Sequence, residues 1–204
     1  LEKIKNSNVE YITLISKNKK NQIRRSIKEY QKNGNIEVQV AKNTDEALLM
    51  LEMLAQLHQK EWMQRGGSGA FSNSFFRDFH NQLIKDRFEC GEIQILKIFN
   101  KVEVIGYIYN FVFNNEVLFY QCGFNYKKGN NYRPGLVSHY YAIQQNLKQN
   151  YSKYNFLAGN ASYKRSLSTN YDELSTIVFC RKNLKSRLEY LLRKVKLALE
   201  KPNG

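Results

Sequence analysis

The sequence reads EVLFYQCGFN at residues 116–125, YKKGNNYRPG at 126–135, LVSHYYAIQQNLKQ at 136–149 and YSKYNFLAGNASYK at 151–164. These segments are patterned as a hydrophobic strand, a basic loop rich in Gly and Asn, an amphipathic helix, and a strand that ends in a Gly-centred loop. A strand followed by such a loop and a helix N-terminus favours anions, because free backbone N–H groups and the positive helix end meet there. Arg133 adds a guanidinium that can hold phosphate through two parallel hydrogen bonds. The stretch therefore predicts a site for a phosphorylated donor.

The composition is that of a globular protein. The chain has 204 residues, of which 42% are hydrophobic and 25% charged, and this suits one ordinary core. No apolar run reaches the roughly 18–20 residues of a membrane span, and no secretory signal opens the sequence. The first residue is Leu1 rather than Met, so we expect a processed protein or a C-terminal fragment. We predict a cytoplasmic protein.

The cysteines and histidines predict neither disulfides nor a metal site. Cys90, Cys122 and Cys180 are odd in number and widely spaced, which fits a reducing compartment. Cys122 and Cys180 fall in apolar strand patterns and are expected to act as small hydrophobic residues. The histidines have no metal-ligand spacing, and we predict no metal. His58 fits the apolar stripe of a helix and is predicted to be structural.

The charge is strongly positive. The net charge is +14, with basic clusters at 17–32 and 182–201. The pattern favours a solvated basic face, with contact to nucleic acid, an anionic membrane or an anionic polymer as alternatives. No zinc finger or RNP-type aromatic strand accompanies the charge, so nucleic acid, tRNA included, is not the favoured partner. The amphipathic pattern from residue 184 predicts a helix that packs on protein rather than on lipid, although the pattern also permits interfacial lipid binding.

Periodicity and turn residues predict the order of elements. Thr44 is predicted to cap the second helix, and Asn100-Lys101 and Asn114-Asn115 to form tight hairpin turns, since Asn tolerates positive φ. The compact solution is an α/β (α+β) fold, with one mixed, largely antiparallel sheet flanked by helices. Helices are predicted at 17–33, 47–62, 73–88, 135–150, 163–169 and from 184, and strands at 36–41, 92–99, 102–113, 116–123, 154–158 and 174–181.

Five segments of the sequence, taken in order along the chain, resemble a known family. Together they resemble GNAT acetyltransferases of the BioF2-like or cellulose-biosynthesis-like group, which is related to the Fem peptidyltransferases. The resemblance covers about residues 17–182 and corresponds to the C-terminal half of longer members. It implies a connecting segment at 1–34, a GNAT-like domain at 35–182 and a basic helix at 183–204. The five segments are LHQKEWMQRGGSGAFSNSFFRDF (57–79), QILKIFNKVEVIGYIYNF (94–111), FYQCGFN (119–125), RPGLVSHYYAI (133–143) and YNFLAGNASYKRSL (154–167).

The resemblance implies an acyl-CoA-dependent N-acyltransferase that uses acetyl-CoA or another acyl-CoA as co-substrate. Such an enzyme holds a thioester against an amine, while strand backbone binds the pantetheine arm and a backbone N–H polarises the carbonyl. The residues assigned on this basis are Gln121, Gly123, Asn131, Arg133, Gly135 and Leu136 for the donor, Tyr163, Lys164 and Asn160 for catalysis, and Trp62 and Phe71 for the acceptor. Structural roles stay open beside these: an ordinary turn and helix start for Arg133, Gly135 and Leu136, a surface helix for Tyr163 and Lys164, a cross-strand pair for Gln121, and core packing, the favoured role, for Trp62.

Two departures from the family pattern leave the catalytic base open. Asn160 stands where an acidic residue is frequent, and Leu167 where Trp is frequent. Asn160 cannot take up a proton near pH 7. Three functions therefore stay open: N-acyl transfer to an amino sugar, a cell-envelope polysaccharide precursor or an amino-acid-like acceptor; Fem-like transfer from aminoacyl-tRNA; and a non-catalytic GNAT-like binding module. An upstream GNAT-like half of the same protein is a further expected partner.

Overall fold

The computed structural model describes residues 1–7, 9–127, 129, 131–177, 179 and 188–192. It divides into two compact units, Leu1–Tyr171 and Asp172–Gly204. In the first unit the elements are α1 (Glu2–Ser7), η1 (Tyr11–Thr13), α2 (Lys17–Gln31), β1 (Glu37–Val40), α3 (Thr44–Gln64), η2 (Ala70–Ser72), α4 (Ser74–Arg87), β2 (Ile93–Phe99), β3 (Val104–Phe113), β4 (Glu116–Phe124), α5 (Pro134–Lys148), β5 (Lys153–Asn155) and α6 (Ser162–Leu167).

One sheet with the strand order β1-β2-β3-β4-β5 forms the centre of the first unit. Neighbouring strands from β1 to β4 are antiparallel, and β5 runs parallel to β4. The predicted mixed, largely antiparallel α/β sheet is therefore confirmed. The Asn114-Asn115 turn is confirmed as well, since both residues have positive φ, 48° and 60°.

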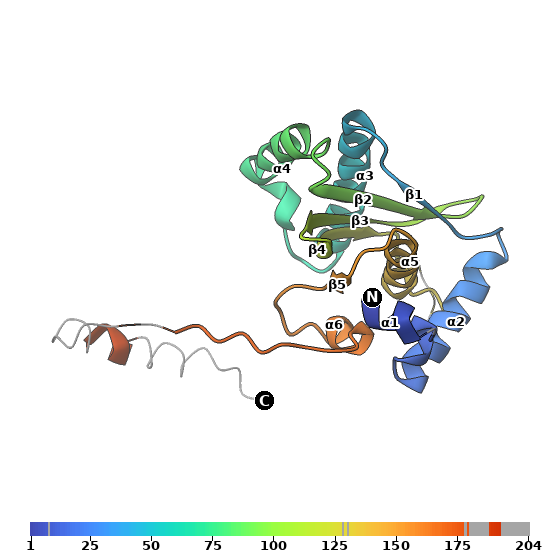
Figure 1. Ribbon diagram of the computed structural model, residues 1–204. Coiled ribbons are helices and arrows are strands. Elements are labelled where there is room, and N and C mark those ends of the chain that lie inside the picture. Colours follow the sequence, from blue (N-terminus) through green and yellow to red (C-terminus); the bar gives the residue numbers. More distant parts are fainter. Residues whose placement is uncertain (8, 128, 130, 178, 180–187, 193–204) are drawn as a thin grey trace. The chain divides into compact units, whose positions relative to one another are not determined.

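Helices cover both faces of the sheet (Figure 1). Alternation along the strands sends side chains to two separate cores. One core joins the sheet to α3 and α4, and includes Leu54, Ile84 and Tyr109. The other joins it to α2, α5 and α6, and includes Ile23, Val137 and Leu167.

A buried layer of amides fixes α5 against the sheet. Gln94 of β2 donates to the side chain of Asn146 on α5 at 2.8 Å, and Asn110 of β3 donates to Gln94 at 2.8 Å. All three side chains are buried. Loss of these buried bonds is costly, so they favour the position of the helix at which Asn146 meets Gln94.

Two predictions from the sequence are wrong: the residue that caps α3, and the turn between β2 and β3. Asn43, not Thr44, caps α3, because its side chain accepts a hydrogen bond from Glu46 N–H at 2.9 Å. The turn between β2 and β3 is not a two-residue turn with positive φ at Asn100 and Lys101. Instead, the side chain of Asn100 accepts from the N–H groups of Val102 and Glu103, which closes a wider loop.

Two predicted strands differ from the structure. The strand predicted at 154–158 ends at Asn155. Residues 172–177 and 179, in the second unit, form no strand, so the prediction for 174–181 is wrong over these residues. Phe179 in this segment is 92% exposed. Residues 188–192 are helical as expected, while Cys180 and the rest of the basic C-terminal cluster lie outside the described residues.

Candidate functional site

The end of β4 is an open sheet edge. Strand β5 pairs with β4 only as far as Leu118 and Asn155, whereas β3 pairs with β4 up to Phe124. On the β3 side, Asn125 N–H donates to Ile105 C=O. Because antiparallel residues alternate in direction, Cys122 must point its N–H and C=O outward, away from β3.

The edge is open because the chain turns sharply after β5. The side chain of Asn155 accepts from Leu157 N–H at 2.8 Å, and Leu157 has a φ of 58°. A branched residue in the left-handed region carries strain of about 1–3 kcal/mol, which surrounding structure must offset. After this turn residues 156–161 form no strand, so in the described part of the chain β4 has no strand partner on the outer side of Cys122.

Gly123 brings α3 unusually close to this edge. A Cβ at Gly123 would lie 2.2 Å from the Leu54 carbonyl oxygen, so only glycine permits the contact. His58 lies one helical turn after Leu54. The close packing therefore carries His58 to the backbone of β4.

Side chains cap the outward groups of Cys122. Gln121 Oε1 accepts from Cys122 N–H at 3.1 Å, and His58 Nδ1 lies 3.1 Å from the Cys122 carbonyl oxygen. Both caps are side-chain groups, and either can be replaced by a ligand without breaking the sheet. The predicted donor residue Gln121 thus lies at the edge with its amide oxygen already engaged.

The two predicted acceptor residues surround His58 on the α3 side. The His58 ring lies 5.9 Å from the ring of Trp62 and 5.3 Å from that of Phe71. Phe71 is buried, whereas Trp62 is 44% exposed. Burial lowers the pKa of His58 below its ordinary value, and the bond to Cys122 partly offsets this effect. His58 is therefore neutral at pH 7.

An aromatic cluster fills the α5 side of the edge. His139 on α5 lies 4.6 Å from Phe119 and stacks on Tyr163 of α6 at 5.6 Å. Its Nδ1 lies 3.1 Å from the Tyr154 hydroxyl. Burial, with a smaller contribution from Lys164, lowers the pKa of His139 to about 3. His139 is thus an uncharged core residue.

Of the three predicted catalytic residues, the structure brings Tyr163 and Lys164 together near Cys122. Burial, with a contribution from the Cys122 thiol, raises the pKa of Tyr163 to about 12, so its hydroxyl stays protonated. Burial lowers the pKa of Lys164, whose Nζ donates to Ala158 C=O at 2.7 Å. Burial also raises the pKa of Cys122 to about 12, which leaves an inert thiol. Asn160 lies exposed in the preceding loop.

The predicted donor loop follows β4 and leads into α5. Pro134 is the first residue of α5, Arg133 is exposed, and its side chain makes no capping bond. Gly135 faces Phe124, and an added Cβ would lie 3.1 Å from that ring. Asn131 is exposed, and its carbonyl accepts from the Ser26 hydroxyl of α2 at 2.7 Å, so α2 supports the loop. Leu136 is buried in the core beneath.

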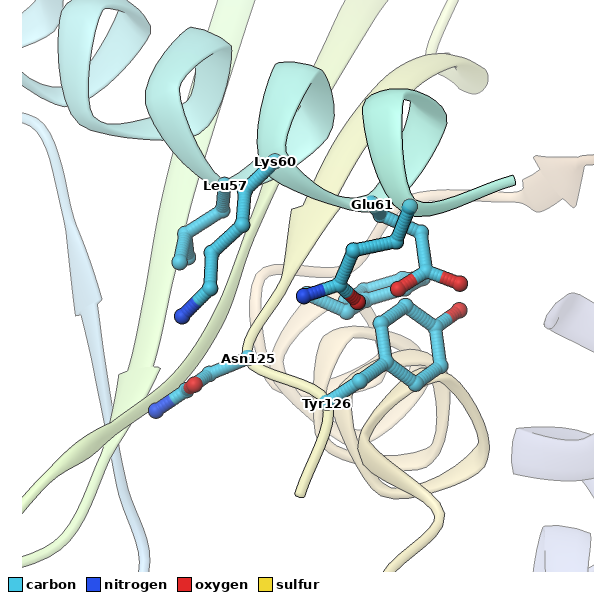
Figure 2. A pocket seen from close by; sticks show the side chains of 7 residues that line it. Leu57, Lys60, Glu61, Asn125 and Tyr126 are labelled. Carbon is cyan, nitrogen blue, oxygen red and sulfur yellow. The ribbon is translucent and has the colours of Figure 1, made fainter. Parts of the chain in front are cut away.

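A shallow pocket lies between α3 and the start of this loop (Figure 2). Leu57, Lys60 and Glu61 of α3 face Asn125 and Tyr126, which follow β4. Arg65 binds Glu61 and lies 5.8 Å from the centre of the Tyr126 ring. The pocket adjoins the open edge, and its lining carries both charge signs together with an aromatic face.

Two further kinds of site are not found in the described part of the chain. Within residues 1–7, 9–127, 129, 131–177, 179 and 188–192, no cluster of His, Cys, Asp or Glu could hold a metal ion. Over the same residues, no helix is long and apolar enough to cross a membrane.

Residues 17–165 match the sequence profile of the acetyltransferase (GNAT) domain. The chain belongs to this family. The match begins with α2 and ends in α6, so it contains the open edge, the donor loop and the Tyr163-Lys164 pair. No curated protein matched the sequence of this GNAT domain.

Solved acetyltransferase structures are similar to this GNAT domain at a distance. An aminoglycoside acetyltransferase from an uncultured soil metagenomic sample is 13% identical, with a TM-score of 0.46 over 72% of this chain and 99% of its own. A predicted acetyltransferase from Clostridium acetobutylicum, solved with acetyl-CoA, is 10% identical, with a TM-score of 0.42 over 74% and 97%. PaiA N-acetyltransferase from Thermoplasma acidophilum, solved with coenzyme A, is 16% identical, with a TM-score of 0.36 over 57% and 75%.

Sequence reasoning missed the position of His58. Its place on the apolar stripe of α3 predicted a structural role, but the structure places it against the outward carbonyl of β4. Gly123 is the one signal in the sequence that points to this contact, because glycine in a strand interior marks a close backbone approach.

Proposed function

We propose that this GNAT domain transfers an acyl group from acyl-CoA to a primary amine. The observation that carries the proposal is the open edge of β4, which runs directly into the donor loop and the N-terminus of α5. An extended pantetheine arm fits an unpaired strand edge, while phosphate fits a loop followed by a helix N-terminus. One continuous segment thus offers groups for both parts of coenzyme A.

The proposed roles follow from the position of each group. The Cys122 N–H polarises the thioester carbonyl once Gln121 has moved, which is the preorganised donor that acyl transfer needs. Arg133 and the N–H groups of Gly135 and Leu136 hold the pyrophosphate. Tyr163 donates a proton to the departing thiolate, because its raised pKa keeps the hydroxyl protonated. Lys164 and Asn160 border the acceptor near the acyl group.

The acceptor is proposed to reach the edge from the α3 side, past Trp62 and Phe71. Its chemistry is that of a primary amine on an amino sugar, a polysaccharide precursor or an amino-acid-like molecule. Aromatic side chains such as half-exposed Trp62 provide a flat apolar face for the carbon skeleton of such acceptors.

The experiment is calorimetric titration of the protein with acetyl-CoA. The parent protein should bind, and Arg133→Ala should bind more weakly by about 1–3 kcal/mol if Arg133 holds phosphate. Arg77→Ala removes the same charge from the exposed surface of α4 and serves as the matched control. Equal affinity in the parent and Arg133→Ala removes Arg133 from the site, and no binding by the parent contradicts the proposed function.

A second candidate is transfer from aminoacyl-tRNA, which the basic helix α2 favours. The helix carries Lys17, Lys19, Lys20, Arg24, Arg25 and Lys28 against the single acid Glu29. Clustered cations bind polyanions with strong salt dependence. Competition between charged tRNA and acetyl-CoA in the same titration distinguishes this candidate, while donor binding without turnover of any amine favours a non-catalytic module.

A further inference from the structure

His58 and His139 each have one buried ring nitrogen without a partner, Nε2, but only His58 combines it with a position at the open edge. His80 lies between the Tyr109 and Tyr120 hydroxyls, 3.3 and 3.1 Å from its two nitrogens, so both are engaged. His139 is enclosed in the α5-side cluster, where a pKa of about 3 makes it a very weak base. His58 has Nδ1 at the Cys122 carbonyl, while its Nε2 has no partner.

The contact to Cys122 fixes the tautomer of His58. A carbonyl oxygen only accepts hydrogen bonds, so Nδ1 must carry the proton in the neutral ring. Nε2 therefore presents a lone pair. A buried lone pair without a donor is unusual, because buried polar atoms generally have partners. The site thus contains a ready acceptor that the folded protein does not use.

The His58 ring lies among the residues proposed to contact the acceptor, on the α3 side of the open edge. The Trp62 and Phe71 rings flank the imidazole, and a Cβ at Gly67 would lie 2.9 Å from the Trp62 ring. The buried Phe71 ring covers one side of the imidazole, while the half-exposed Trp62 and the glycine loop lie on the other side. Exposed side chains change rotamer rapidly, so an amine can reach Nε2 without unfolding α3.

We propose that His58 Nε2 accepts the proton of the attacking amine, and so supplies the base that Asn160 cannot be. This proposal rests on the proposed acyl transfer. The same residue, Cys122, offers its N–H to the thioester carbonyl and its C=O to His58, so the imidazole lies next to the residue that holds the thioester, with Nε2 on the side of the ring that faces away from Cys122. Tyr163 lies on the opposite, α5 side of the edge, and the proton acceptor and the proton donor are thereby kept apart.

The step balances without any further reactant. The amine nitrogen forms a bond to the acyl carbon, and the bond between that carbon and the CoA sulfur breaks with its electron pair leaving on sulfur. Nε2 takes the proton of the new amide nitrogen, and Tyr163 gives its proton to the thiolate. Exchange with water then returns His58 and Tyr163 to their starting states.

Two substitutions separate a base from a structural hydrogen-bond donor. His58→Asn keeps an N–H near the position of Nδ1 and so keeps the bond to Cys122, but it has no basic nitrogen. His58→Ala removes both functions and leaves space for imidazole. Turnover is measured as coenzyme A release from acetyl-CoA with glucosamine, glycine and spermidine as acceptors, alongside acetyl-CoA binding by calorimetry.

We expect both variants to bind acetyl-CoA within about threefold of the parent and to lose at least 100-fold in kcat, the usual scale of a general base. Imidazole should restore turnover to His58→Ala but not to His58→Asn. The parent kcat at saturating substrates should rise with pH to a plateau, with its midpoint below pH 6.5, because burial lowers the pKa of His58 and the neutral ring is the active form. The rise should be absent in His58→Asn.

The outcomes keep the two proposals distinct. If the parent acylates an amine and His58→Asn does so at the parental rate, the role of His58 is overturned while the function stands. If a ¹⁵N spectrum shows His58 protonated on Nε2 in its neutral form, the role is likewise overturned. If the parent binds acetyl-CoA but acylates none of the amines, or does not bind it, the proposed function fails and the base fails with it.

Discussion

The two ends of β4 hold their backbone in different ways. At its start, the strand pairs with β3 on one side and with β5 on the other, through Glu116, Val117 and Leu118. At its end, the β3 side is paired as before, but the outer side of Cys122 is capped by the side chains of Gln121 and His58. Backbone hydrogen bonds between strands are part of the fold, whereas hydrogen bonds from side chains can be exchanged for bonds to a ligand. The start of β4 is therefore fixed in the sheet, while at its end a ligand need only displace the side chains of Gln121 and His58.

The largest expected effect is on stability, and it tests the close packing of α3 on the end of β4 at Gly123. Gly123→Ala places a methyl group against the Leu54 carbonyl, at a separation that no small side-chain shift relieves. The clash between this methyl group and the α3 backbone should lower the free energy of unfolding by about 3 kcal/mol, measured by urea denaturation. Gly67→Ala is the control, because its neighbour is the half-exposed Trp62 ring, and a loss under about 1 kcal/mol is expected there. Equal losses in the two variants would show that α3 does not depend on the Gly123 contact.

The next prediction concerns the uncharged core on the α5 side. His139 has a pKa of about 3 in the folded protein, against about 6.5 when unfolded. The unfolded state then binds more protons, so His139 lowers the free energy of unfolding as pH falls through 6.5. Between pH 7.5 and pH 5 its contribution should be about 2 kcal/mol.

The measurement is urea denaturation at both pH values. His139→Phe should flatten the decrease by that amount. Tyr154→Phe serves as the control, since it removes the partner of His139 but keeps the titrating ring, and it should leave the decrease in place. An unchanged decrease in His139→Phe would mean that the histidine is protonated in the folded protein.

A smaller effect is expected at the start of α6. Tyr163→Phe and Lys164→Ala should each lower turnover at least tenfold, which corresponds to roughly 1.4 kcal/mol in the barrier. Arg165→Ala, on the exposed face of the same helix, should leave turnover unchanged. Lys164 also holds the Ala158 carbonyl, so the melting temperature of each variant must be compared with the parent. Parental turnover in both variants would leave these residues as the start of a structural helix.

The smallest effect tests the replaceable cap itself. In Gln121→Ala, the Cys122 N–H no longer has its own side-chain acceptor, so a donor carbonyl need not compete for it. Acetyl-CoA should bind tighter by about 0.5–1.5 kcal/mol, the net value of one hydrogen bond, as measured by calorimetry. Weaker binding would instead show that the Gln121 amide itself contacts the donor.

The sequence was sufficient for the paired part of the sheet and insufficient for the open part. Alternating residues and the Asn114-Asn115 turn predict the β2–β3–β4 meander, because both depend on local backbone preference. The early end of β5 depends on an Asn155 side-chain bond and on Leu157 in a left-handed conformation, which no propensity favours. His58 was placed correctly on its helix face, but what lies opposite that face is a tertiary property. The roles of the assigned site residues stay predictions until they are measured.

The amide layer beneath α5 also constrains what this protein can bind. A helix held only by apolar side chains can slide by one turn, about 5.4 Å, at modest energetic cost. Such a slide would separate Asn146 from Gln94 and leave buried amides unpaired, so the helix is locked in one register. The start of α5 is then held at a fixed distance from the Cys122 N–H. Under the proposed function, this fixed spacing selects donors whose phosphate and acyl group are separated by the matching length.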